Sequence, residues 1–150
     1  MITDETIQGV DSHNVPAWYW AAAIAALLFE ALGCYLYLVE VRMSAQDIAA
    51  LPLDQGAVLA ARPAWYYAAY GTAVWLGLTG TVGLLLRRRW AVPLLLVSLI
   101  AVLVQFSSVF LVPAMRAVTP SDALLLPVVI IILCYGIFML SRLARRRGWR

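Results

Sequence analysis

The chain is predicted to be an all-α integral membrane protein, a bundle of four transmembrane helices in a single domain over residues 1–150. Hydrophobic residues make up 64% of the 150 residues and charged residues only 13%, and the mean hydropathy is +0.87. A soluble domain of this size cannot bury so much apolar surface. The apolar residues also fall into four runs, each close to the roughly 20 residues that a helix needs to cross a bilayer. These runs cover residues 17–39, 64–86, 91–112 and 122–140.

The four runs are predicted to be helices joined in up-down-up-down order. They lack the alternation of a membrane β-strand, and a helix satisfies its own backbone polar groups in lipid. The connections are short, and even the longest, the outer loop at residues 40–63, is too short for a domain. Within this loop, Ser44 and Asp47 have the spacing of a capping box, which predicts a short interfacial helix. Pro52 followed by Asp54 to Gly56 predicts a turn.

The placement of arginine orients the bundle. All eleven basic residues are arginines. Eight lie on the side shared by the N-terminus, the second connection and the C-terminus: Arg87, Arg88, Arg89, Arg142, Arg145, Arg146, Arg147 and Arg150. The three on the other side are Arg42, Arg62 and Arg116. By the positive-inside rule we expect both termini in the cytoplasm (N-in/C-in), in a bacterial inner membrane. Arginines at helix ends anchor topology and meet anionic lipid, so no nucleic-acid partner is expected.

One acidic residue, Glu30, lies near the middle of the first run, where insertion scales give an acid a cost of about 2.5–3.5 kcal/mol. Glu30, Tyr37 and Glu40 share one helical face. No arginine is expected at this depth, so Glu30 is predicted to be protonated at neutral pH, because desolvation favours the neutral carboxyl.

The third run carries a polar stripe of its own, formed by Ser98, Gln105 and Ser108. Glu30 comes 13 residues after the start of the first run and Gln105 comes 14 after the start of the third. Both are therefore expected about 20 Å above the cytoplasmic edge, which predicts that they are partners. Two interpretations stay open: a structural hydrogen bond within the bundle, or a site for a solute or proton.

The second run has small residues at a spacing that favours close helix packing. Ala69, Ala73, Gly77 and Thr81 repeat every four residues, with Gly80 beside them. Such a ladder lets two helix backbones approach closely, within the chain or across a dimer.

The two cysteines are predicted to be packing residues at different depths. Counting from the helix ends places Cys34 about 25 Å and Cys134 about 10 Å from the cytoplasmic edge, too far apart for a disulfide. Catalytic patterns are absent as well. The only histidine is His13, and no Ser-His-Asp set, metal-ligand cluster or phosphate-binding loop occurs. Neither an enzyme nor a cofactor or metal site is expected.

Several short segments, taken in order, carry a resemblance. They are Pro16-Ala17-Trp18-Tyr19-Trp20, Glu30-Ala31-Leu32-Gly33, Tyr37 and Glu40 before Met43, Leu51-Pro52, Pro63-Ala64-Trp65, Gly77 and Gly80, Trp90-Ala91-Val92-Pro93-Leu94, Ser98-Leu99, Gln105 and Gly148-Trp149. The chain resembles a family of small four-helix bacterial membrane proteins that are commonly labelled "sugar transporter" or uncharacterised. The family usually has Asn at the position of Glu30, which favours a hydrogen-bonding site over a proton carrier.

The sequence thus predicts a small inner-membrane protein that binds or transports a small polar solute. The alternative is a non-catalytic accessory or assembly subunit that packs against a larger membrane complex. Expected partners are the lipid bilayer and, depending on the interpretation, a small polar solute, a second copy of the chain or a larger complex. The substrate and any coupling ion are left open.

Overall fold

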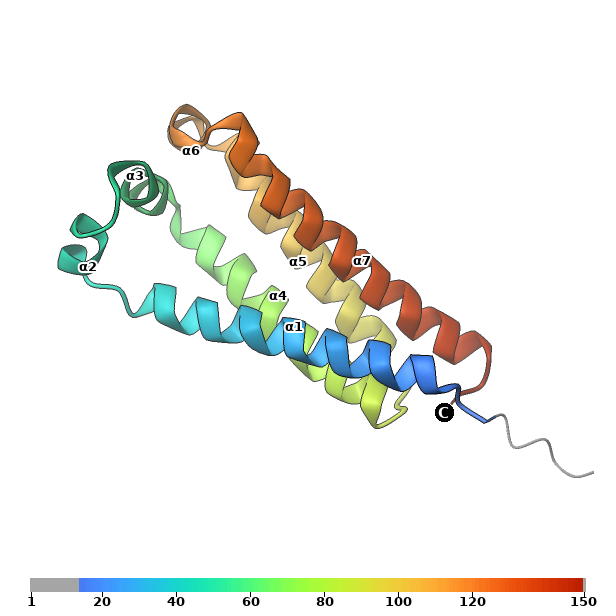
Figure 1. Ribbon diagram of the computed structural model, residues 1–150. Helices are drawn as coiled ribbons and strands as arrows, with labels where there is room; N and C mark the ends of the chain where they lie inside the picture. Colours follow the sequence, from blue (N-terminus) through green and yellow to red (C-terminus); the bar gives the residue numbers. More distant parts are fainter. Residues whose placement is uncertain (1–13, 150) are drawn as a thin grey trace, which may run out of the picture.

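The computed structural model describes residues 14–149, which are helical and contain no strand (Figure 1). The acidic residues of the N-terminal tail, His13 and Arg150 lie outside the described residues. Four helices are long and apolar enough to cross a membrane, as the sequence predicts. They are α1 (Ala17–Val41), α4 (Ala64–Leu85), α5 (Ala91–Leu111) and α7 (Leu125–Arg146).

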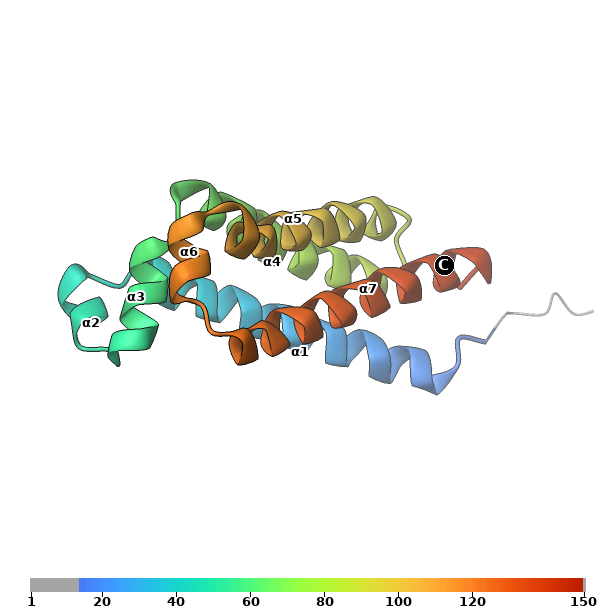
Figure 2. The ribbon, with the colours of Figure 1, turned by 90° about the horizontal axis from the view of Figure 1, so that it is seen from above.

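The four long helices form a four-helix bundle. Helix α4 packs against both α1 and α5, and α5 packs against α7. Seen from the side, α1 and α4 lie together (Figure 1), and seen from above, α4 and α5 lie together (Figure 2). The bundle therefore follows chain order around its axis, and α4 and α5 have the most neighbours. Helix α7 presents most of its surface outward.

The short helices gather at one end of the bundle, called here the loop end (Figure 1). They are α2 (Ala45–Ala49), α3 (Leu53–Ala61) and α6 (Pro113–Val118), and α3 contacts α6. The opposite end, called here the arginine end, holds the start of α1, the α4–α5 turn and the end of α7. Helix α2 begins with the predicted capping box, in which Ser44 and Asp47 bond reciprocally. These hydrogen bonds, from the Ser44 backbone and side chain, hold the pKa of Asp47 below its usual range.

The connections differ from the sequence prediction in three places. The fourth helix, predicted over residues 122–140, consists of a short 3-10 helix η1 (Ser121–Leu124) followed by α7, which continues to Arg146. The prediction stopped where the arginines begin, but arginine is a good helix former and a helix can continue into the headgroup layer. The predicted turn at Asp54 to Gly56 is wrong, because both residues lie inside α3. Helix α6, which starts at a proline suited to a first turn, was not predicted.

Helices α4 and α7 end with the same capping motif at the arginine end. After α4 the N–H of Arg88 donates to the carbonyl of Gly83 at 2.8 Å, and after α7 the N–H of Trp149 donates to the carbonyl five residues back at 3.0 Å. In each case the residue before the donor is left-handed: Arg87 has φ 57° and Gly148 has φ 66°. This is the Schellman motif. Gly148 adopts the conformation without strain, whereas a Cβ-bearing residue such as Arg87 does so at a cost.

A contact between distant segments closes the arginine end. Trp149 folds back so that its ring lies 5.6 Å from that of Tyr19. The Tyr19 hydroxyl donates to the carbonyl of Leu84 at 2.8 Å, and Arg87 Nε donates to the carbonyl of Trp149 at 3.2 Å. The start of α1, the α4–α5 turn and the chain after α7 are thereby joined.

Candidate functional site

Glu30 is buried near the middle of α1 and faces α4. Glu30 is 5% exposed. The carboxyl group occupies the space that a side chain at Gly77 would fill: an added Cβ would overlap the carboxyl and lie 2.8 Å from Glu30 Oε1. The missing side chain at Gly77 is therefore what admits the carboxyl between α1 and α4.

The Glu30 carboxyl has no partner of its own in the described part of the chain. Within residues 14–149 no hydrogen bond or ion pair joins it. The polar groups in electrostatic reach are the thiols of Cys34, one turn further along α1, and Cys134 on α7. The Cys34 thiol donates to the carbonyl of Val74 at 3.3 Å. Neither carboxyl oxygen of Glu30 is among the fully buried atoms without a partner, but a carboxyl in the middle of a membrane helix without a protein donor needs an explanation beyond packing.

The depth assigned to Cys134 from the sequence is wrong. Cys34 and Cys134 are both buried and free, as the sequence predicts, and both thiols are within electrostatic reach of Glu30. The estimate counted from residue 140, but α7 continues to Arg146 and so places Cys134 deeper. The α7 helix therefore contributes to the surroundings of Glu30.

Gln105, predicted to be the partner of Glu30, is bonded elsewhere. Its amide Nε2 donates to the hydroxyl of Tyr66 at 3.1 Å. Tyr66 lies eleven residues before Gly77 on α4, about 16 Å along the helix axis. At the height of Gly77, α5 approaches α4 through Leu95, which a Cβ on Gly80 would meet, and through Ser98.

The rest of the predicted stripe on α5 is buried but does not reach Glu30 through a hydrogen bond. The Ser98 hydroxyl donates to the carbonyl of Ala73 at 2.6 Å. The Ser108 hydroxyl is fully buried and has no hydrogen-bond partner in residues 14–149. The stripe therefore faces α4. Ser98 lies in the middle of the bundle, whereas Gln105 and Ser108 lie toward the loop end.

At the loop end, Glu40 belongs to a network that the sequence did not predict. Glu40 forms an ion pair with Arg62, and both side chains are largely buried. The Arg62 guanidinium also lies over the ring of Tyr66, 4.5 Å from its centroid. Tyr66 in turn accepts from Gln105. The sequence contains one indication of this ion pair: Glu40 lies at the end of the first predicted helix and Arg62 just before the second, on the same predicted side of the membrane.

Tyr37 and Tyr70 link this network to the middle of the bundle. The Tyr37 hydroxyl lies over Gly71, where an added Cβ would come within 2.8 Å of it. The Tyr37 and Tyr70 rings are 5.1 Å apart, and the Tyr70 and Tyr66 rings are 6.1 Å apart. Polar and aromatic groups thus run from Glu30 to the loop end, and we call this set the polar column: Glu30, Cys34, Tyr37, Tyr70, Tyr66, Gln105, Arg62 and Glu40.

On the other side of Glu30, toward the arginine end, the interior is mainly apolar, although Thr81 and Ser141 are buried there. A buried cluster there brings together Ala23 and Ala26 of α1, Leu84 of α4, and Leu95 of α5, with Ile137 of α7 beside them. The Thr81 hydroxyl on this side donates within its own helix, to the carbonyl of Leu78 at 2.8 Å, so the polar column reaches Glu30 from the loop end.

The small residues of α4 lie inside the bundle. Ala73, Gly77, Gly80 and Thr81 are buried, and Ala69 is half-buried. Gly77 faces α1 through Glu30, whereas Gly80 faces α5 through Leu95. The ladder thus packs within the chain, against two different helices.

The predicted topology anchors lie together at the arginine end. Arg87, Arg88 and Arg89 form the α4–α5 turn, while Arg145 and Arg146 belong to the last turn of α7, followed by Arg147. Among residues 14–149 no group of three or more histidine, cysteine or acidic side chains could hold a metal ion.

Comparison of the chain with family models, with curated proteins and with solved structures gave no match. The resemblance drawn from the sequence therefore stays a prediction, and the function has to be argued from the site.

Proposed function

We propose that the protein binds a small polar solute at Glu30 and passes it across the membrane. The observation that carries the proposal is the buried Glu30 carboxyl, which has no donor within residues 14–149 although it lies in the middle of a membrane-spanning helix. Ionisable groups in such positions are rare and are functional-site candidates by default, substrate pathways among them. A solute hydroxyl or amine would supply the missing donor.

The polar column supports entry from the loop end. Its hydroxyl, amide and charged groups extend from Glu40 and Arg62 toward Glu30, whereas the apolar cluster around Ala23 and Leu95 separates Glu30 from the arginine end. Aromatic rings combined with a few polar groups are typical of small-molecule sites. The resemblance to proteins labelled "sugar transporter" agrees with a solute that carries several hydroxyls.

The proposal includes the topology. The bundle is up-down-up-down, with both termini in the cytoplasm of a bacterium and the loop end outside. The charge distribution supports this orientation, because Arg42, Arg62 and Arg116 belong to the loop-end connections and every other described arginine belongs to the arginine end. The solute then enters the column from outside.

The test is solute-driven swelling of proteoliposomes, followed by light scattering, with glycerol, erythritol, xylitol and glucose as probes. Wild-type protein should speed the entry of at least one probe over protein-free liposomes. Glu30→Met should remove this gain. The control is Ser107→Met. The Ser107 hydroxyl is not part of the polar column and donates to the carbonyl of Val104 in its own helix at 2.6 Å. Liposomes with Ser107→Met should swell at the rate of wild type. Equal rates for wild-type and protein-free liposomes would refute transport of these probes.

A second function, an accessory subunit of a larger membrane complex, is favoured by one specific feature. Gly136 on α7 has nothing within 4 Å of the position of an added Cβ, and Ile132 and Tyr135 beside it are exposed. A glycine on an open helix face lets another helix approach closely. Native mass spectrometry of protein extracted from its own membranes should then show a stable complex that Gly136→Leu dissociates.

A further inference from the structure

The arginine end carries a large positive charge that the described chain does not balance. Seven arginines lie there: Arg87, Arg88, Arg89, Arg142, Arg145, Arg146 and Arg147. The acidic residues of the described range lie elsewhere, with Glu30 in the middle of α1 and Glu40, Asp47, Asp54 and Asp122 at the loop end. So many like charges at one end destabilise the compact state unless anions bind.

Three of these arginines are already engaged by the protein itself. Arg87 donates to the carbonyl of Trp149, Arg147 lies 5.3 Å from the Trp149 ring centroid, and Arg142 lies 5.9 Å from that of Phe138. In contrast, Arg89 and Arg145 are exposed and make no ion pair or side-chain hydrogen bond within residues 14–149. Their guanidinium groups are available to a ligand.

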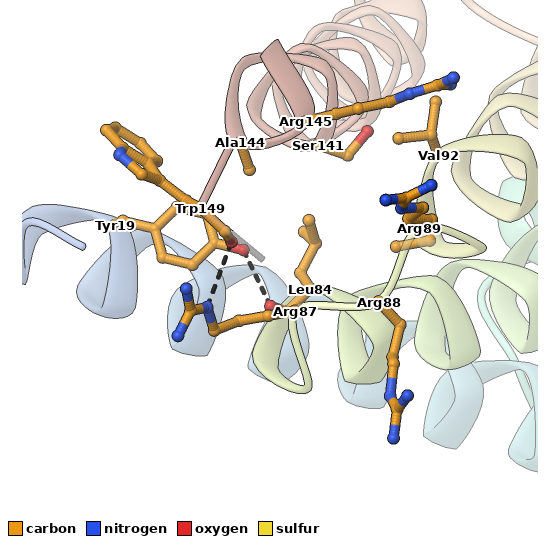
Figure 3. Close-up of a pocket in the computed structure, with 11 residues that line it drawn as sticks. Tyr19, Leu84, Arg87, Arg88, Arg89, Val92, Ser141, Ala144, Arg145 and Trp149 are labelled. Atoms are coloured by element: carbon orange, nitrogen blue, oxygen red, sulfur yellow. Dashed lines mark hydrogen bonds between the residues drawn. The ribbon is translucent and has the colours of Figure 1, made fainter. Parts of the chain in front are cut away.

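Arg89 and Arg145 border one pocket, although they come from different elements. The pocket lies between the start of α1, the α4–α5 turn and the end of α7, with Tyr19 and Ser141 among its lining residues. Figure 3 shows the Arg89 and Arg145 side chains on the side of Val92, whereas the Arg88 side chain points the opposite way. Both side chains thus lie on the same side of the α4–α5 turn, near the first turn of α5.

The first turn of α5 adds to the attraction for an anion. In that turn the Ala91 N–H donates to the carbonyl of Arg88 at 3.3 Å and Pro93 has no N–H, so the Val92 N–H is the backbone donor of the turn that is left for an anion. The two arginines supply planar donors that match a phosphate in a bidentate manner. A phosphate, which offers several oxygens, can accept from both arginines at once.

The pocket is too narrow to enclose a free anion. Its cavity volume is about 20 Å³, roughly the room for one water molecule. The polar groups at its floor are also satisfied, because Tyr19 donates to the Leu84 carbonyl and Ser141 donates to the Phe138 carbonyl. A ligand must lie across the mouth, on the arginines.

Surrounding side chains place this mouth at the membrane surface. Trp18 and Trp90 are exposed, and tryptophan collects at the level of lipid headgroups. Leu86, beside the turn, is 59% exposed and offers apolar contact to an acyl chain. A lipid can use the arginines and this apolar surface together, whereas a free phosphate can use the arginines only.

We propose that Arg89 and Arg145, with the first turn of α5, bind the phosphate of an anionic phospholipid headgroup at the arginine end. The site is distinct from the Glu30 site and does not depend on solute transport. It acts as a fixed lipid contact between the α4–α5 turn and α7, two segments that otherwise meet through Trp149.

The test measures lipid binding to the full chain in a neutral detergent by native mass spectrometry. Phosphatidylglycerol and phosphatidylcholine with identical acyl chains are the probes. Wild-type protein should prefer phosphatidylglycerol. Arg89→Gln with Arg145→Gln should weaken phosphatidylglycerol binding about 25-fold, since each basic side chain near an anionic surface contributes about fivefold. Arg89→Lys with Arg145→Lys keeps the charge and should give a smaller loss, because lysine cannot bind bidentately.

The matched control is Arg88→Gln with Arg146→Gln. It removes the same charge from the same turn and helix. Arg88 also lines the pocket, but its side chain points away from those of Arg89 and Arg145 (Figure 3), so this pair should weaken binding less than the Arg89 and Arg145 pair does. Equal losses for both pairs would mean diffuse attraction without a site and would overturn the proposal. Displacement of the lipid by inorganic phosphate at comparable affinity would overturn the lipid as the ligand. Unchanged melting temperatures of all variants verify that folding is intact.

Discussion

Helix α1 carries two glutamates on one face, Glu30 and Glu40, and the side chains around them differ in kind. Glu40, at the loop end, meets Arg62 and through it the ring of Tyr66. Glu30, ten residues earlier and about 15 Å deeper, meets the bare backbone of Gly77. The same residue type is therefore a member of an ion pair in one place and an open acceptor in the other.

This difference indicates which of the two glutamates stabilises the fold. The ion pair of Glu40 and Arg62, covered by the ring of Tyr66, holds two helix ends together, although Nε of Arg62 has no hydrogen-bond partner within residues 14–149. A buried carboxyl with no donor contributes nothing to helix association that an apolar side chain could not supply, since burying it carries a cost. Stability should depend on the surroundings of Glu40, and function on Glu30.

The largest effect is expected when the space beside Glu30 is filled. Gly77→Leu places a branched side chain where the Glu30 carboxyl lies and forces α1 and α4 apart. Overpacking of this kind costs about 3 kcal/mol, so the melting temperature in detergent should fall sharply. Gly136→Leu is the matched control, because nothing lies near its Cβ and its melting temperature should stay close to that of wild type. If both variants melt alike, the close contact of Glu30 with Gly77 is wrong.

A smaller loss is expected when the ion pair at the loop end is broken. Arg62→Gln leaves the Glu40 carboxylate without its cation and removes the cation from Tyr66. Removing one member of a buried pair costs about 3–5 kcal/mol, and partial access to water at this end should reduce this to ~2 kcal/mol. Chemical denaturation measures the change. Adding Glu40→Gln to Arg62→Gln should recover part of the loss, and a double variant as unstable as the sum of the single ones would contradict a direct pair.

The contrast between these regions also marks what the sequence could predict. The spans were predictable because bilayer thickness sets the length of an apolar helix, and three of the four predicted spans agree with the structure within two residues at each end. The capping box of Ser44 and Asp47 was predictable because all its atoms lie within one turn. The end of α7 was not, because the change from apolar to arginine marks the membrane boundary and not the end of the helix.

The candidate site was predictable only in part. Glu30 is conspicuous because it is an acid inside an apolar run. Its neighbour was assigned to Gln105 by counting from helix starts, which assumes that adjacent helices begin at one height. In the structure α5 passes the level of Gly77 near Leu95 and Ser98, two turns before Gln105. Arg62 lies in a connection in the sequence, and only the fold brings it to Glu40.

The smallest change in stability is expected at Glu30 itself. Glu30→Gln keeps the shape of the side chain, and Glu30→Met keeps its length without the polar atoms. Because no hydrogen bond from Glu30 holds the helices within residues 14–149, both variants should unfold within about 0.5 kcal/mol of wild type, or Glu30→Met should be more stable. Glu30→Met should nevertheless abolish solute-driven swelling. A stable but inactive variant is what a binding group gives when its burial is a cost to the fold. Should Glu30→Met instead lower stability by 1–2 kcal/mol, the range for hydrogen bonds between membrane helices, Glu30 would be a structural group like Glu40, and the distinction between the two glutamates would fail.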